Sequence, residues 1–195
     1  GDTCVFFGKK PAVLFRYISG TVGDQIPKGG LYTVGAQLAK IHSVERNFSL
    51  RPRKEDWMWE PQDVGQYIIH KSKHIIEKGY PDARNFVSFV AEKFKTLPDF
   101  RGLPLGVTHQ DVKQENVIVD PHGKIHFIDF DLSYLGILLI DLATPIIWFC
   151  FTDSGEFLNE NALELLHGYS SVRRLATEEK NLFYDAVRFR LLRES

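Results

Sequence analysis

Apolar residues recur with a helical period over several stretches of the chain. Between residues 31 and 42 the large aliphatic residues are Leu31, Val34, Leu38 and Ile41, three or four residues apart, which is the spacing of one helix face. The same kind of spacing, with Asp82 as the N-cap of one segment, predicts helices over residues 31–42, 62–78, 82–97, 159–169 and 177–193. The last segment is acidic in its first turn and basic in its last, as the helix dipole favours.

The pattern changes to that of short strands in two places. Residues 4–20 alternate short apolar runs around a GKKP turn, so we expect a hairpin whose second strand ends at Gly20. Residues 117–119 and 125–128 flank the sequence DPHG, whose Asp, Pro and Gly suit positions i, i+1 and i+3 of a type I turn. This second pattern predicts a small hairpin.

The most apolar stretch of the chain is LGILLIDLATPIIWFCF at residues 135–151, which is close to membrane-spanning length. Asp141 near its middle would cost about 2.5–3.5 kcal/mol in a bilayer, and Pro145 interrupts the stretch. We therefore expect a buried helical segment and no membrane span.

The composition of the chain excludes some classes of partner and favours others. The chain has 195 residues, 44% of them hydrophobic, which is enough for one large domain or two closely packed lobes. Its 24 Lys and Arg balance 25 Asp and Glu, which argues against nucleic acid or a membrane surface as partner and favours a small molecule. Cys4 and Cys150 form no CxxC pair, and the N-terminus lacks a signal-peptide pattern, so we expect a reducing, cytoplasmic setting. The oligomeric state is not indicated.

Polar residues concentrate on both sides of the second predicted hairpin. HQDVKQENV at residues 109–117 leads into its first strand, and IDFD at residues 128–131 follows its second. Antiparallel pairing carries the start of one strand and the end of the other to the same edge. We therefore expect six side chains to converge there: His109, Asp111, Lys113, Asn116, Asp129 and Asp131.

These residue types suit one kind of chemistry. Two carboxylates and a carboxamide form an all-oxygen ligand set, which suits Mg²⁺ better than zinc or copper, and such Mg²⁺ usually carries nucleotide phosphates. Phosphoryl transfer also needs a base that orients the acceptor and a cation beside the transferred group, roles open to Asp111 and Lys113. The predicted cofactors are therefore ATP and Mg²⁺, and these residues do not distinguish ATP from GTP.

The same residues resemble the motifs of the protein-kinase-like fold. HQDVKQENV matches the HxDxxxxN catalytic loop, IDFD stands in the place of the DFG aspartate, and IDLA at residues 140–143 is similar to a segment of the aminoglycoside phosphotransferase and choline kinase superfamily. The resemblance implies that Asp111 is the catalytic base, that Asn116 and Asp129 bind Mg²⁺, and that His109 and Asp141 support the loop. Lys113 is similar to the lysine of serine/threonine protein kinases and either contacts a phosphate or is solvated.

The resemblance implies an α+β fold with a mostly helical C-lobe that carries the catalytic hairpin. Residues 1–20 would be the end of the N-lobe sheet and the hinge, and residues 21–195 the C-lobe. The apolar stretch after IDFD leaves no room for a protein-kinase activation segment, so the expected acceptor is the hydroxyl of a small metabolite. VGAQLAKIH and LLHGYSSVRRLATEE resemble homoserine kinases, which makes homoserine the first candidate and an aminoglycoside or choline-like alcohol the alternative.

Some interpretations stay open at this level. No GxGxxG phosphate loop occurs in the chain, and residue 1 already lies in what resembles the late part of the N-lobe sheet, where the family's nucleotide-binding lysine would precede it. We therefore expect a truncated chain with an incomplete small lobe and ATP site. A catalytically inactive kinase-like binding module is a further alternative. Asp131 could bind a second Mg²⁺, orient the substrate or cap the following segment. Trp57, in EDWMWE, is either a substrate contact or a packing residue. His42 and the remaining histidines show no ligand spacing and are interpreted as surface or packing residues.

Overall fold

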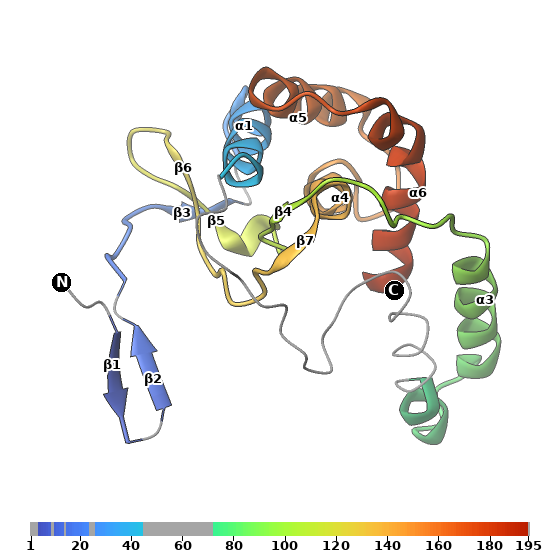
Figure 1. The fold of residues 1–195 in the computed structure, drawn as a ribbon. Coiled ribbons are helices and arrows are strands. Elements are labelled where there is room, and N and C mark those ends of the chain that lie inside the picture. Colours follow the sequence, from blue (N-terminus) through green and yellow to red (C-terminus); the bar gives the residue numbers. More distant parts are fainter. Residues whose placement is uncertain (1–3, 9, 14, 24–25, 45–71, 195) are drawn as a thin grey trace.

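The computed structural model describes residues 4–8, 10–13, 15–23, 26–44 and 72–194. Helices form most of this part and are accompanied by small antiparallel sheets, of which the β4–β7 pair (Leu105–Val107 with Leu135–Ile137) lies beside α4, so the fold is α+β as predicted (Figure 1). The helices are α1 (Gly30–His42), α3 (Ala83–Lys95), α4 (Leu138–Phe149), α5 (Asn159–Val172) and α6 (Thr177–Glu194).

Four of the five helices predicted from apolar spacing are confirmed with shifts of a few residues at their ends. Of the fifth, predicted over residues 62–78, the structure shows residues 72–77 as helix, and its first part lies outside the described residues. Asp82 stands at the N-cap of α3, but its backbone is left-handed, with φ 57°, and its side chain makes no capping hydrogen bond. In α1 the buried face includes Leu31, Val34 and Leu38, as their spacing indicates.

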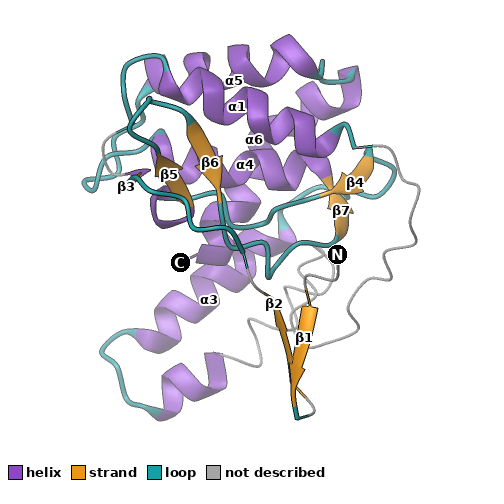
Figure 2. Cartoon of the chain, turned by 90° about the vertical axis from the view of Figure 1, so that its left-hand side faces the viewer, coloured by secondary structure: helices purple, strands orange, loops and turns teal. Residues whose placement is uncertain are grey.

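Helices α1 and α5 lie side by side and approach each other closely (Figures 1 and 2). Two glycines make this possible. A Cβ atom at Gly35 of α1 would overlap the backbone carbonyl of Leu165, and one at Gly168 of α5 would overlap the carbonyl of Tyr32. The helix pair therefore depends on positions where any side chain would separate the two backbones.

Helix α4 is almost completely buried and packs against α5 and α6. The prediction of one helical segment over residues 135–151 was wrong at its start, because residues 135–137 form strand β7 and the helix begins at Leu138. Pro145 does not end the helix. A proline in a helix interior removes one hydrogen bond and costs about 3 kcal/mol, which the burial of nearly every α4 side chain offsets.

The strands form three small antiparallel sheets, paired β1–β2, β3–β5–β6 and β4–β7. Their bounds are β1 (Cys4–Phe7), β2 (Lys10–Val13), β3 (Thr21–Val22), β4 (Leu105–Val107), β5 (Val117–Val119), β6 (Ile125–Phe127) and β7 (Leu135–Ile137). The β1–β2 hairpin is confirmed and stands apart from the helices in both views (Figures 1 and 2). Its second strand ends at Val13, not at Gly20 as predicted, because the chain then leaves this hairpin and pairs with β5 at Thr21.

The β5–β6 hairpin is confirmed with its predicted turn. The Gly123 N–H donates to the Asp120 carbonyl at 2.9 Å, which closes the four-residue turn. Asp120 Oδ1 accepts hydrogen bonds from the backbone N–H groups of His122 and Lys124, both at 2.9 Å, and Oδ2 lies 3.0 Å from His126 Nε2. The hydrogen bond to His126, together with these backbone bonds, lowers the pKa of Asp120 to about 2. The turn thus fixes the register that places both strand ends.

The hydrophobic core is shared by α1, α4, α5, α6 and the inner faces of β5 and β6. Val34, Leu38, Leu142 and Leu165 are fully buried in it. Within the described residues, no helix combines the length and the apolar character that crossing a bilayer would require. Cys150 is buried in this core as a free thiol, and burial raises its pKa to about 12.

Candidate active site

The backbone of the loop between β4 and β5 is hydrogen-bonded to one buried carboxylate, that of Asp141. Asp141 lies in the first turn of α4 and is completely buried. Its Oδ2 accepts the backbone N–H of His109 and its Oδ1 accepts that of Gln110, both at 2.7 Å. Burial alone would raise the pKa of Asp141, but hydrogen bonds from His42 and from these two N–H groups hold it below its usual value. Asp141 is therefore an ionised acid that fixes the loop backbone.

Two residues beside the predicted site have left-handed backbone conformations that glycine normally adopts. Gln110 has φ 71° and Asp129 has φ 62°. Such conformations cost free energy in residues with a Cβ atom and persist only where surrounding contacts enforce them. For Gln110 the enforcing contact is visible, because Asp141 binds its N–H group.

His109 is completely buried and contacts both polar segments, the one with Asp111 and the one that begins at Ile128. Its Nε2 lies 3.0 Å from the carbonyl oxygen of Ile128, which can only accept, so Nε2 carries the proton. Its Nδ1 can then accept the backbone N–H of Asp111, at 3.3 Å. Burial lowers the pKa of His109, which agrees with this neutral tautomer. The ring also packs against Phe127 and Phe130, with centroids 5.7 and 4.4 Å away.

Asp111, Lys113 and Asn116 are in direct contact. Asn116 Nδ2 donates to Asp111 Oδ2 at 2.7 Å and to the Asp111 carbonyl at 2.9 Å. Lys113 Nζ lies 3.0 Å from the same Oδ2, and this hydrogen bond raises the pKa of Lys113, which keeps it charged. No described residue donates to Asp111 Oδ1, which leaves this oxygen available to a ligand.

The hairpin brings the second acidic segment to the same edge at the level of the backbone. Ile128 N–H donates to the Asn116 carbonyl at 3.0 Å, directly beyond the pair Val117 and Phe127. Asp129 is the next residue and its side chain is exposed. The 3₁₀ turn η2 (Gln114–Asn116) precedes β5 and places Asn116 opposite this segment.

The ligand set fits a hard divalent cation. Because Asn116 directs Nδ2 at Asp111, its oxygen Oδ1 is the atom left for a metal, and Asp129 offers a carboxylate. An amide oxygen and a carboxylate, completed by water and phosphate oxygens, are typical of Mg²⁺. Across the described part of the chain there is no group of three or more His, Cys, Asp or Glu side chains that could hold a metal without such additional ligands.

The remaining predicted site residues have different positions. Asp131 is exposed, and its carboxylate accepts no hydrogen bond from the residues that the structure describes, so the capping role is not observed. Trp57 lies outside the described residues.

A buried chain of hydrogen bonds that ends at Asp141 was not predicted from the sequence. His42 Nε2 lies 2.9 Å from Asp141 Oδ2, and its Nδ1 lies 2.7 Å from the Tyr169 hydroxyl. Arg173 donates to that hydroxyl at 2.9 Å and to both oxygens of the buried Glu179 at 2.9 and 3.0 Å. The only local signal was the position of His42, four residues after Leu38 on the buried face of α1. Its partners lie about a hundred residues or more away, and no local pattern identifies them.

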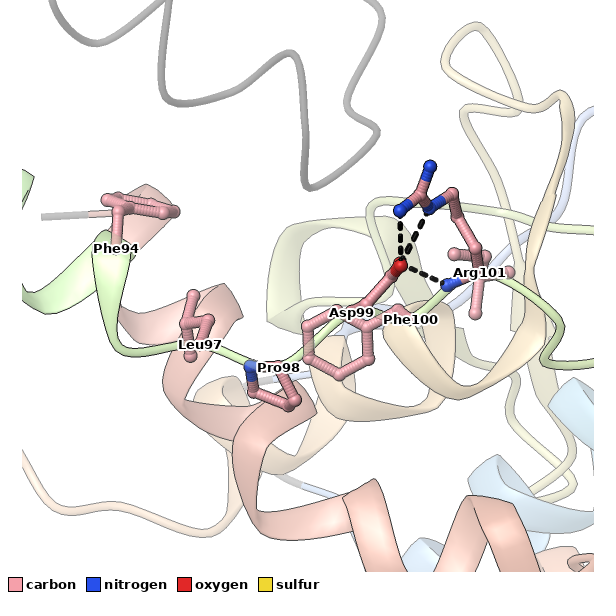
Figure 3. Close-up of a pocket in the computed structure, with 7 residues that line it drawn as sticks. Phe94, Leu97, Pro98, Asp99, Phe100 and Arg101 are labelled. Carbon is pink, nitrogen blue, oxygen red and sulfur yellow. Dashed lines mark hydrogen bonds and ion pairs between the residues drawn. The ribbon is translucent and has the colours of Figure 1, made fainter.

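Two pockets formed by described residues do not include Asp111 in their lining. One, of about 430 Å³, is formed by the end of α3 and the segment after it (Figure 3). Phe94 and Phe100 line it, and the exposed pair Asp99 and Arg101 forms part of its wall. A second, of about 460 Å³, reaches the loop only at Gln114, whose side chain donates to the Trp148 carbonyl. Neither contains a predicted site residue.

Comparison with known proteins gives a family match. Residues 4–175 match the phosphotransferase enzyme family. The homoserine kinase of Paramagnetospirillum magneticum is 25% identical over 184 residues, which cover 87% of this chain and 52% of that protein. The chain therefore spans about half the length of this curated relative.

Solved structures show the same fold at low identity. An aminoglycoside phosphotransferase from Alicyclobacillus acidocaldarius superposes with a TM-score of 0.60 at 14% identity, covering 98% of this chain and 62% of the other. A spectinomycin phosphotransferase, in complex with ADP and spectinomycin, superposes with a TM-score of 0.61 at 16% identity, covering 99% and 61%. At these identities the similarities show the fold and do not identify the substrate.

Proposed function

The chain belongs to the phosphotransferase enzyme family, and on this premise we propose that it transfers the γ-phosphoryl group of ATP to the hydroxyl of a small metabolite, with homoserine as the first candidate. The observation that carries the proposal is the environment of Asp111. Its Oδ2 is occupied by Asn116 and Lys113, whereas its Oδ1 has no partner in the described part of the chain. The side chain is partly exposed, so an acceptor hydroxyl can reach it.

In the proposed reaction Asp111 orients the acceptor and receives its proton. The hydroxyl oxygen attacks the γ-phosphorus, the bond from phosphorus to the bridging oxygen breaks, and ADP leaves. Lys113 is kept positive by Asp111 and supplies a cation close to that carboxylate. His109 takes no part as an acid or base, because both its ring nitrogens are engaged by the backbone.

Asn116 and Asp129 would hold Mg²⁺, with Asn116 oriented by its two hydrogen bonds to Asp111. Bound there, the cation would neutralise negative charge on the phosphate oxygens. Asn116 contacts both segments of the proposed site: its side chain donates to Asp111, and its backbone carbonyl accepts the N–H of Ile128, the residue before Asp129.

The choice of homoserine is supported by sequence and not by a described acceptor pocket. The curated relative at 25% identity is named a homoserine kinase. An aminoglycoside is the second candidate, supported by the fold similarity to the aminoglycoside and spectinomycin phosphotransferases. Homoserine is a small zwitterion and an aminoglycoside is a large polycation, so one assay can separate the two.

The test is ADP release with a panel of alcohols at fixed Mg-ATP. We expect turnover with homoserine and little with choline, kanamycin or spectinomycin. Turnover of an aminoglycoside but not of homoserine would reverse the ranking and keep the phosphotransferase assignment. Calorimetry with Mg-ATP addresses the inactive alternative, because nucleotide binding without turnover of any alcohol would indicate a binding module.

A further inference from the structure

Gln110 of the catalytic loop is held at both of its backbone polar groups. The N–H of Gln110 donates to Asp141 Oδ1 at 2.7 Å, and the C=O of Gln110 accepts a hydrogen bond from Arg190 Nη2 at 3.2 Å. Gln110 is the left-handed residue directly before Asp111. Asp141 comes from α4 and Arg190 from the last helix, α6, so two separate elements hold one strained residue.

Arg190 is difficult to explain as a stabilising residue. It is 1% exposed, and its Nε and Nη1 atoms have no hydrogen-bond partner among the described residues. Its nearest carboxylate, Glu194 at 3.1 Å, is about one third exposed and could be solvated without it. A buried and partly unsatisfied guanidinium lowers stability relative to an apolar side chain of similar volume. The contact that only a long donor can supply is the one to the Gln110 carbonyl.

Without the hydrogen bond from Arg190, the peptide between Gln110 and Asp111 would be free to rotate. A residue with φ near 70° is held against its intrinsic preference for the right-handed region, and rotation toward that region would turn the following residue. The following residue is Asp111, whose carboxylate must meet the acceptor hydroxyl within hydrogen-bonding distance. The orientation of Asp111 therefore depends on both contacts to Gln110.

We propose that Arg190 is a positioning residue, which acts through the Gln110 carbonyl to keep the Asp111 carboxylate directed at the acceptor. This inference rests on the proposed function for its consequence in turnover, but the geometry it describes can be tested separately. It gives α6 a part in the site although none of the site residues predicted from the sequence lies on that helix.

The experiment compares Arg190→Met with Arg190→Lys and with the control Arg188→Met. Arg188 lies on the same helix and bonds Asp185 and Thr96, away from the loop. Two measurements are made on each variant: hydrogen exchange of the amides of residues 109–111, and kcat and KM for Mg-ATP and acceptor. A circular-dichroism melt records overall stability.

For Arg190→Met we expect faster exchange at residues 109–111, with unchanged protection in α1 and α5. We expect kcat to fall about 10- to 100-fold, which corresponds to one hydrogen bond from a charged donor, with both KM values within about twofold. Arg190→Lys should be intermediate, and Arg188→Met should match the wild type in exchange and turnover.

Two results would overturn the proposal. One is wild-type exchange at residues 109–111 and wild-type kcat in Arg190→Met. The other is faster exchange throughout the helices together with a lower melting temperature, which would make Arg190 a packing residue only. If the wild-type chain phosphorylates no alcohol, the proposed function fails, and the exchange measurement alone still decides whether Arg190 holds the loop.

Discussion

His42 Nε2 lies 2.9 Å from Asp141 Oδ2, and both side chains are completely buried. Asp141→Asn removes the charge while keeping the shape, and leaves only one oxygen to serve two backbone N–H groups and His42. We expect the free energy of unfolding to fall by about 1–3 kcal/mol for each buried N–H group that loses its acceptor. Urea denaturation at pH 7 measures the change, with the exposed Asp153→Asn as control.

The same pair predicts a pH dependence. The pKa of Asp141 is lower in the folded chain than in the unfolded chain, so folding is favoured while the group is ionised. This contribution is complete above about pH 4, the ordinary pKa of Asp, and is lost as the pH falls through the lower folded value. The stability difference between wild type and Asp141→Asn should therefore be constant near neutral pH and shrink below about pH 4. A difference that grows on acidification would contradict this account.

Asp111→Asn tests the assignment of the base. An amide of the same shape can keep a hydrogen bond to Lys113 but cannot take the acceptor proton. We expect kcat for the best acceptor to fall by about 10²–10⁴, the usual contribution of a general base, with little change in the KM for ATP. Asp99→Asn, in the exposed pair with Arg101, is the matched control. Undiminished turnover in Asp111→Asn would remove Asp111 from the mechanism.

Asp129→Asn tests the metal assignment. Replacing a carboxylate ligand by an amide lowers the attraction for Mg²⁺, so half-maximal turnover should require at least about tenfold more Mg²⁺. Asp131→Asn, two residues away and equally exposed, is the comparison and should shift the Mg²⁺ titration much less. Equal shifts in the two variants would show that the carboxylates have been assigned to the wrong roles or act together.

Asp120→Asn tests the turn that aligns the hairpin. The carboxylate accepts two backbone hydrogen bonds and pairs with His126, and its pKa of about 2 is below the ordinary value. Its stabilising effect is present above about pH 4 and is lost as the pH falls toward 2. The variant should therefore melt at a lower temperature than wild type at pH 6, with a smaller difference at pH 3. Thermal melts at the two values check this.

Gly35→Ala should destabilise the protein, although the same substitution stabilises most helices. Alanine in a helix interior usually stabilises by about 1 kcal/mol relative to glycine. Here its Cβ would overlap the Leu165 carbonyl and force α1 away from α5. We expect a net loss of about 1–3 kcal/mol in the free energy of unfolding, as for overpacked sites. A gain in stability would show that the helices can separate at low cost.

The β5–β6 hairpin could be predicted because the residues that specify it are close together in the sequence. The apolar runs of β5 and β6 flank a turn whose Asp120 and Gly123 occupy the expected positions, and the polar segments adjoin both strands. Strands β4 and β7 could not be predicted in the same way. Each is three residues long, their pairing joins segments about thirty residues apart, and β7 runs directly into an apolar helix.

The buried contacts of His42, Tyr169 and Arg190 could not be predicted from the sequence for a different reason. His42, Tyr169 and Arg190 each meet partners some 80 to 130 residues away, and none shows a spacing that would distinguish it from a packing or surface residue. Their roles appear only when the helices are placed relative to one another.

The hydrogen-bond chain from Glu179 through Arg173, Tyr169 and His42 ends on the carboxylate that shapes the catalytic loop. A line of buried hydrogen bonds thus joins the helical interior to the loop that carries the proposed base. In a variant library scored only by turnover, substitutions at Glu179 should resemble substitutions at the proposed substrate-binding residues, although Glu179 contacts Arg173 and not those residues. Redesign for another acceptor should accordingly leave this line intact and vary side chains that have no connection to it.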